Sequence, residues 1–234
     1  MPNQTIVKMK DIDKEYTLGK TKIQALKNID LEIFENDFLV IAGPSGSSKT
    51  TLLNILGLID TPSAGELWFG GTKLADNKHD GLYRYRRDHL GYIFQNFNLI
   101  PVMNVYENVE SPLILKKISH GNRKTIVEDV LHKVGLFDRK NHKPNELSGG
   151  QRQRVSIARA IVKKPRVVLA DEPTANLDSK TGTEIIELME KLNKEEKITS
   201  KSFNVNCFWC ILALDKKIMV MLDFCYNEIE HHQN

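Results

Sequence analysis

A glycine-rich turn between an apolar run and a helix-forming segment most constrains what this chain can fold into. Residues 38–42 are apolar throughout, which is typical of a strand buried on both faces of a sheet. Residues 50–56 then carry apolar side chains at the spacing of a short helix that stops at Gly57. A strand, a glycine turn and a helix in this order open a parallel α/β unit, so we expect an α/β fold.

The turn matches the phosphate-loop pattern G-x-x-x-x-G-K-[ST] except at Ser48, where the pattern has glycine. Backbone N–H groups and a helix N-terminus in such a loop form a concave anion site. Lys49 would neutralise the β- and γ-phosphates, and the Thr50 hydroxyl would hold Mg²⁺. A side chain at residue 48 costs about 1 kcal/mol if the backbone there needs a positive φ. The expected ATP-binding residues of this turn are Gly43, Pro44, Ser45, Gly46, Ser47, Ser48, Lys49, Thr50 and Thr51.

A second chemical element is the pair Asp171-Glu172, which ends the apolar run 167–170. An aspartate at the end of a buried strand can hold Mg²⁺ while the carboxylate that follows activates an attacking water. We therefore expect Asp171 to be a metal-binding residue and Glu172 to be the general base.

The third element is Leu147 followed by Ser148, Gly149, Gly150 and Gln151. Ser148 can cap a helix whose first N–H groups, freed of side chains by the two glycines, point at an anion. This stretch resembles the signature sequence of the ATP-binding-cassette (ABC) ATPases. The resemblance covers about residues 5–198, and its details are similar to the subfamily that powers lipoprotein release and macrolide or peptide export.

The resemblance implies roles for residues that the motifs alone do not assign. Gln95 would sense Mg²⁺ and face the membrane partner, residues 176–178 would cross to the other subunit, and Tyr16 would stack on adenine. Two subunits would meet head to tail, so that Ser148–Gln151 of one act on the ATP held by the phosphate loop of the other. The implied fold is an ABC-type P-loop core with an antiparallel β portion and a helical subdomain at about 96–160.

The coarse pattern of the chain agrees with that fold. The first 34 or so residues alternate as strands, residues 63–94 are again strand-like, and apolar residues at 127, 130, 131 and 134 favour a helix closed by Gly135. Residues 184–194 are an amphipathic helix.

Composition limits the partners of the chain. Its 234 residues carry a net charge of +3, without the concentrated basic face typical of nucleic-acid binders. No secretory signal is visible, and no run approaches the ~18 apolar residues of a spanning helix. We expect a cytoplasmic homodimer held on the inner face of the cell membrane by a separate permease subunit.

The pattern changes at about Thr199, so we divide the chain into an ABC domain at 1–198 and a divergent tail at 199–234. The family places a histidine that orients the water some thirty residues after the general base, near residues 203–206, where this sequence has none. The expected buried strand is also missing there, and all three cysteines lie in the tail. A reading-frame shift or gene decay accounts for this; a zinc site at Cys207, Cys210, Cys225 and His231 is the alternative.

Two other functions stay open. One is a nucleotide-binding protein that does not hydrolyse ATP, because Ser48 replaces a glycine and the histidine is absent. The other is a soluble cassette protein of repair or translation, against which the surroundings of Gln95 argue.

Overall fold

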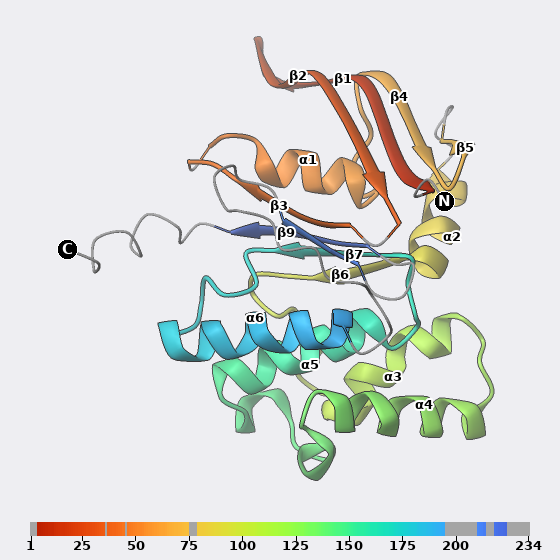
Figure 1. The fold of residues 1–234 in the computed structure, drawn as a ribbon, viewed down its shortest axis with the longest axis vertical. Coiled ribbons are helices and arrows are strands. Elements are labelled where there is room, and N and C mark those ends of the chain that lie inside the picture. Colours follow the sequence, from red (N-terminus) through yellow and green to blue (C-terminus); the bar gives the residue numbers. More distant parts are fainter. Residues whose placement is uncertain are drawn as a thin grey trace.

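The computed structural model describes residues 4–35, 37–44, 46–74, 79–194, 210–213 and 218–223. In this part of the chain, strands and helices form two sheets with helices on both sides of one of them (Figure 1). The strands are β1 (Thr5–Leu18), β2 (Thr21–Phe34), β3 (Phe38–Ala42), β4 (Ala64–Phe69), β5 (Thr72–Lys73), β6 (Leu90–Ile93), β7 (Val167–Asp171), β8 (Cys210–Ala213) and β9 (Ile218–Asp223). The helices are α1 (Lys49–Leu56), α2 (His79–His89), α3 (Val105–Leu115), α4 (His120–Lys133), α5 (Gly149–Ile161) and α6 (Ser179–Lys194), with short 3₁₀ turns η1 (Phe137–Arg139) and η2 (Pro144–Glu146).

The first sheet is antiparallel, with the strand order β2-β1-β4-β5. Strand β1 has several register irregularities against β2, so its buried residues do not follow strict alternation. Ile6, Met9 and Ile12 of β1 and Phe69 of β4 are buried toward α1 and the second sheet. The antiparallel β portion expected from the sequence is confirmed.

The second sheet is mainly parallel and carries β6, β7, β9 and β3. Strand β9 pairs in parallel with both β3 and β7, and β8 runs antiparallel to β9. The expectation that the buried strand of the tail is missing is therefore wrong. Residues 218–222 are an apolar run, Ile-Met-Val-Met-Leu, and it supplies that strand later in the sequence than expected.

Side chains of β7 explain why its sequence is continuously apolar. Val167 and Leu169 pack into the core that contains α1, whereas Val168 and Ala170 pack into the core that contains α5 and α6. Figure 1 shows α1 between the two sheets and α5 and α6 on the other face of the parallel sheet, with α3 and α4 beyond them. The α/β P-loop fold with an inserted helical subdomain is confirmed.

The strand-like interpretation of residues 63–94 is wrong in its middle, where α2 forms. This helix is strongly polar, and its sequence His-Asp-Gly-Leu-Tyr-Arg-Tyr-Arg-Arg-Asp-His offers few apolar residues from which a period could be read. Leu82 is buried, and the ring of Tyr85 contacts both Phe69 and His89. Tertiary packing of these few side chains decides the structure here.

Candidate functional site

The phosphate loop joins β3 to α1, as the sequence predicts, and Ser48 lies at the start of the helix. Its backbone has φ 60° and ψ 21°, which is the left-handed region. The condition for strain at this position is therefore met, because a residue with a Cβ is less stable there than glycine. An added Cβ at Gly43 would lie 2.8 Å from Oγ of Ser47, so the Ser47 hydroxyl would have to rotate to accommodate it. Ser45 lies outside the described residues.

Lys49, the first residue of α1, turns its ammonium back into the loop. Nζ donates hydrogen bonds to the carbonyl oxygens of Gly43 (2.6 Å) and Pro44 (2.8 Å) and to Oγ of Ser47 (3.3 Å). The residue is buried. A buried ammonium requires such partners, and the contacts hold the positive charge where the loop surrounds it.

Three loops of the site meet because the strands before them are parallel. Strands β3, β9, β7 and β6 run in the same direction, so their carboxyl ends lie at one edge of the sheet, the edge where α/β proteins bind ligands. Lys49 follows β3, Gln95 follows β6, and Asp171 ends β7. Burial raises the pKa of Asp171, while the positive charge of Lys49 partly opposes that rise.

Glu172 is held by its backbone and by its side chain. Its φ of 42° is again left-handed, which is unusual for a residue with a side chain. Nε2 of Gln95 donates a hydrogen bond of 2.9 Å to Oε2 of Glu172. The structure thus brings together two residues that sequence reasoning placed in separate roles, one as a magnesium sensor and one as the general base.

The oxygen donors at this edge fit a magnesium ion. Thr50 offers a hydroxyl and Asp171 a carboxylate, and because Gln95 uses Nε2 toward Glu172, its Oε1 stays available as an acceptor. Such hard oxygen ligands are those that Mg²⁺ prefers. In the described ranges no cluster of three or more His, Cys, Asp or Glu side chains could hold a metal by itself.

The stretch Ser148–Gln151 begins α5, as predicted. Ser148 is the N-cap: its Oγ accepts from the backbone N–H of Gln151 (3.3 Å), and Oε1 of Gln151 accepts from the N–H of Ser148 (3.0 Å). A Cβ at Gly150 would lie 2.5 Å from Cγ2 of Thr181, so close packing against α6 also requires glycine there. Helices α1 and α5 lie on opposite faces of the parallel sheet (Figure 1).

Polar contacts that sequence reasoning missed tie the segment after Gln95 to two other elements. Arg159 of α5 donates to the carbonyl oxygens of Phe97 (2.7 Å) and Asn98 (2.6 Å), two residues with positive φ. Nδ2 of Asn176 donates to the carbonyl oxygen of Gln95 (3.0 Å). The bonds join residues far apart in the sequence, so no local pattern signals them.

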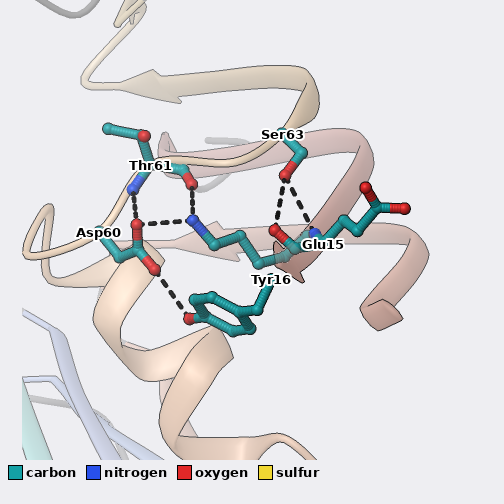
Figure 2. A network of polar contacts seen from close by, with 6 residues as sticks. Glu15, Tyr16, Asp60, Thr61 and Ser63 are labelled. Atoms are coloured by element: carbon teal, nitrogen blue, oxygen red, sulfur yellow. Dashed lines mark hydrogen bonds and ion pairs between the residues drawn. The ribbon is translucent and has the colours of Figure 1, made fainter. Parts of the chain in front are cut away.

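Tyr16 belongs to a polar network at the end of β1 (Figure 2). Its hydroxyl donates to Oδ2 of Asp60 (2.8 Å), and Nζ of Lys14 donates to Oδ1 of the same carboxylate (2.7 Å) and lies 4.8 Å from the centre of the Tyr16 ring. Burial and Asp60 raise the pKa of Tyr16, while the side chain of Thr51 in α1 partly opposes that rise. The bond to Asp60 therefore fixes the Tyr16 ring to the segment that follows α1. Lys14 and Asp60 were not among the residues predicted.

The family described as ABC transporter matches residues 26–175 of this chain. The chain belongs to the ABC transporter family. It is 48% identical over 195 residues to an uncharacterized ABC transporter ATP-binding protein, MJ0796, of Methanocaldococcus jannaschii, covering 82% of this chain and 83% of the relative. It is 48% identical over 190 residues to the macrolide export ATP-binding/permease protein MacB of Bdellovibrio bacteriovorus, covering 81% of this chain and 29% of that protein.

Solved structures of ABC cassettes share the fold. The dimeric structure of MJ0796 in a post-hydrolysis state, bound to ADP and Pi, has a TM-score of 0.77 at 43% identity and covers 94% of this chain and 88% of that chain. The structure of cbiO1 from Clostridium perfringens, part of the ABC transporter complex cbiONQ, has a TM-score of 0.75 at 26% identity, covering 94% of this chain and 79% of that one. The predicted family, its ATPase class and its ATP ligand are confirmed.

The remaining expectations concern membrane-spanning helices, a zinc site and individual site residues. In the described part of the chain, no helix is long and apolar enough to cross a bilayer. The alternative zinc site falls largely outside the described residues, since Cys207, Cys225 and His231 are not among them. The roles of the individual site residues predicted from the sequence stay predictions.

Proposed function

We propose that this ABC ATP-binding subunit hydrolyses ATP at the interface of a head-to-tail homodimer and thereby drives export through a separate membrane permease. The observation that carries the proposal is the hydrogen bond from Gln95 to Glu172 beside Asp171 and Lys49. The bond joins the loops after β6 and β7, and the charge of Lys49 acts on Asp171, so the proposed base, metal-binding carboxylate and phosphate-binding cation lie at one edge of the sheet.

Each residue has a role that follows from its chemistry. Lys49 and the backbone N–H groups of the loop bind the β- and γ-phosphates, and Tyr16 stacks on adenine. Glu172 accepts a proton from the attacking water, and Gln95 orients the carboxylate through Nε2. Thr50, Gln95 and Asp171 would hold Mg²⁺, which when bound supplies charge neutralisation on the phosphate oxygens.

A second subunit would complete the site. Helices α1 and α5 lie on opposite faces of the parallel sheet (Figure 1), and this agrees with Lys49 and the N–H groups of Gly149 and Gly150 serving different nucleotides. In a head-to-tail pair these N–H groups would meet the ATP of the partner and stabilise negative charge as it develops. The dimeric arrangement of the ADP-bound relative supports this proposal.

Mixing two inactive variants tests the arrangement. Lys49→Ala removes the phosphate-binding cation, and Ser148→Arg blocks the α5 N-terminus; each homodimer should be inactive. In a head-to-tail heterodimer one site keeps both intact parts, so an equimolar mixture should recover about a quarter of the wild-type rate: half of the dimers, each with one of two sites. No recovery on mixing, with both variants still dimeric, would refute the arrangement.

The permease is proposed from the family and from the fused relative, which is named as an export ATP-binding/permease protein. A separate permease would hold the subunit on the inner face of the membrane. The test is affinity purification of the tagged chain from detergent-solubilised membranes, where a stoichiometric membrane protein is expected. Recovery of the subunit alone, in the soluble fraction only, would contradict the proposal.

Two observations favour a second candidate function, nucleotide binding without hydrolysis. Ser48 occupies a left-handed position that suits glycine, and the residue after β9 is Phe224 rather than the family's histidine. Phosphate release by the wild type should be measured beside Glu172→Gln. A wild-type rate above that of the variant supports hydrolysis, and equal rates with tight ATP binding support the second candidate.

We also propose that residues 199–234 form a tail of different origin from the domain at 1–198, produced by a reading-frame shift or by gene decay. The support is the abrupt appearance of all the cysteines and the loss of the family's histidine. Sequencing the gene tests this origin: a downstream frame that encodes Thr-His-Asp is expected, and its absence would count against the proposal.

A further inference from the structure

Gln153 lies in the second turn of α5 and is fully buried, with 0% of its surface exposed. Its Nε2 donates a hydrogen bond of 2.8 Å to the carbonyl oxygen of Pro173, 20 residues along the chain. Oε1 of the same amide has no hydrogen-bond partner in the described part of the chain. Because a carbonyl oxygen only accepts, the amide must present its NH₂ group to Pro173, and this single bond fixes its orientation.

The carbonyl that Gln153 holds belongs to the residue directly after Glu172. Glu172 has a φ of 42°, a strained backbone state that persists only where neighbouring contacts enforce it. Pro173 has no N–H to donate, so its carbonyl oxygen is the one backbone group through which this residue can form a hydrogen bond. Gln95 holds the carboxylate of Glu172, and Gln153 holds the backbone beyond it.

We propose that Gln153 is a positioning residue that couples the N-terminus of α5 to Glu172 of the same subunit. The inference rests on the proposed function, in which Ser148–Gln151 contact the ATP of the partner and Glu172 is the base. One end of α5 then contacts one nucleotide, and its second turn holds the base of the other site. A shift of α5 on closure around the first ATP therefore changes the geometry at the second.

Gln153→Met tests the coupling, since methionine fills a similar volume but leaves the Pro173 carbonyl without its donor. We expect kcat to fall by about ten-fold or more, with the ATP Kd within about two-fold of wild type. The Hill coefficient for ATP should move from above unity in the wild type toward unity. Unchanged kcat and Hill coefficient in a folded Gln153→Met protein would overturn the proposal, as would a wild-type Hill coefficient of unity.

Ser156→Ala is the matched control. Ser156 lies one turn further along α5, is equally buried, and its Oγ has no hydrogen-bond partner among the described residues. A change of similar size at this position should leave kcat within about two-fold of wild type. An equal loss of kcat in both variants would mean that any disturbance of the α5 packing suffices, and would overturn a specific role for Gln153.

Gln153→Glu provides a second test that is informative even if the Gln153→Met protein does not fold. Burial raises the pKa of a carboxyl group, so a protonated glutamic acid at residue 153 can still donate to the Pro173 carbonyl at acidic pH. Its kcat relative to wild type should therefore be higher at pH 6 than at pH 8.5. A ratio that does not change with pH would contradict the hydrogen-bond role.

Glu172→Gln separates the two proposals. If that variant loses turnover while Gln153→Met keeps it, only the inference about Gln153 fails. If Glu172→Gln keeps wild-type turnover, Glu172 is not the base and both proposals fail.

Discussion

Nε2 of Gln95 lies 2.9 Å from Oε2 of Glu172, and the amide donates to the carboxylate. The bond fixes the carboxylate and directs Oε1 of the same glutamine away from it. The Gln95 side chain can thus orient the carboxylate of Glu172 through Nε2 and bind a cation through Oε1. Substitutions that change only the donor should separate these functions.

Gln95→Glu is expected to move the pH dependence of ATP hydrolysis to higher pH. The substitution replaces a donor by a second carboxylate about 3 Å from Glu172, and like charges at that distance raise the pKa of the pair. A base with a raised pKa is ionised only at higher pH, so the acidic limb of kcat should shift upward. The measurement is steady-state kcat from pH 5.5 to 9.5, with Gln95→Ala, which adds no charge, as the control. An upward shift of the same size in the alanine variant would contradict the explanation.

Ser48→Gly is expected to stabilise the protein by about 0.5–1 kcal/mol. Glycine removes a left-handed cost of about 1–2 kcal/mol, while its greater freedom in the unfolded chain takes back about 0.5–1 kcal/mol. Urea unfolding without nucleotide measures the difference. Ser47→Gly is the control, since residue 47 is absent from the positive-φ positions and should lose stability. A destabilised Ser48→Gly protein would show that the backbone here carries no strain.

Asp60→Asn is expected to weaken ATP binding by about ten-fold and leave tripolyphosphate binding unchanged. The Asp60 carboxylate fixes the Tyr16 hydroxyl, so its loss frees the ring that is proposed to stack on adenine. Burial acts to raise the pKa of Asp60, but hydrogen bonds from Lys14 and Tyr16 outweigh it and lower the pKa. The interactions of the Asp60 carboxylate with Lys14 and Tyr16 therefore contribute to stability above the ordinary pKa of aspartate. This contribution is lost only as the pH falls through the lowered pKa of the folded state. Isothermal titration with both ligands is the measurement. An equal loss of affinity for ATP and for tripolyphosphate would refute a role of Asp60 in binding adenine.

Asp171→Asn is expected to raise the Tm by about 2–4 °C without nucleotide. Burial raises the pKa of Asp171, so the folded state binds this proton more tightly than the unfolded chain does. Stability therefore falls as pH rises toward the folded pKa, and the penalty is fully present above it. Asparagine removes that penalty, but it should also reduce the rise in Tm that magnesium and ATP produce in the wild type. Thermal unfolding with and without both ligands measures this, and a variant less stable than wild type without them would contradict the prediction.

Local patterns in the sequence were enough to predict the elements that carry the motifs. The apolar runs before Gly43 and Asp171 become strands β3 and β7, and Ser148 caps a helix. Ser48 could be recognised as unusual because a loop pattern specifies glycine at that position, and its φ of 60° supplies the physical reason. Each of these inferences depends on residues that are close together in the chain.

Contacts between distant segments could not be predicted in the same way. Lys14 and Asp60 lie 46 residues apart, and Gln153 and Pro173 lie 20 apart, so their hydrogen bonds exist only once the fold has formed. Helix α2 was missed because its polar sequence has little hydrophobic period. Strand β9 was missed because the strand was expected near residues 203–206, although the run at 218–222 is visibly apolar.

The position of β9 has a consequence for synthesis on the ribosome. The strand that leads to Lys49 and the strand that ends at Asp171 both take hydrogen-bond partners from residues 218–223. A nascent chain therefore holds the two halves of its nucleotide site on separate, unpaired strand edges until residues 218–223 have been synthesised. Such long-range closure is slow, and the exposed edges need protection meanwhile. Production of active protein should depend on chaperones that shield the growing chain during translation.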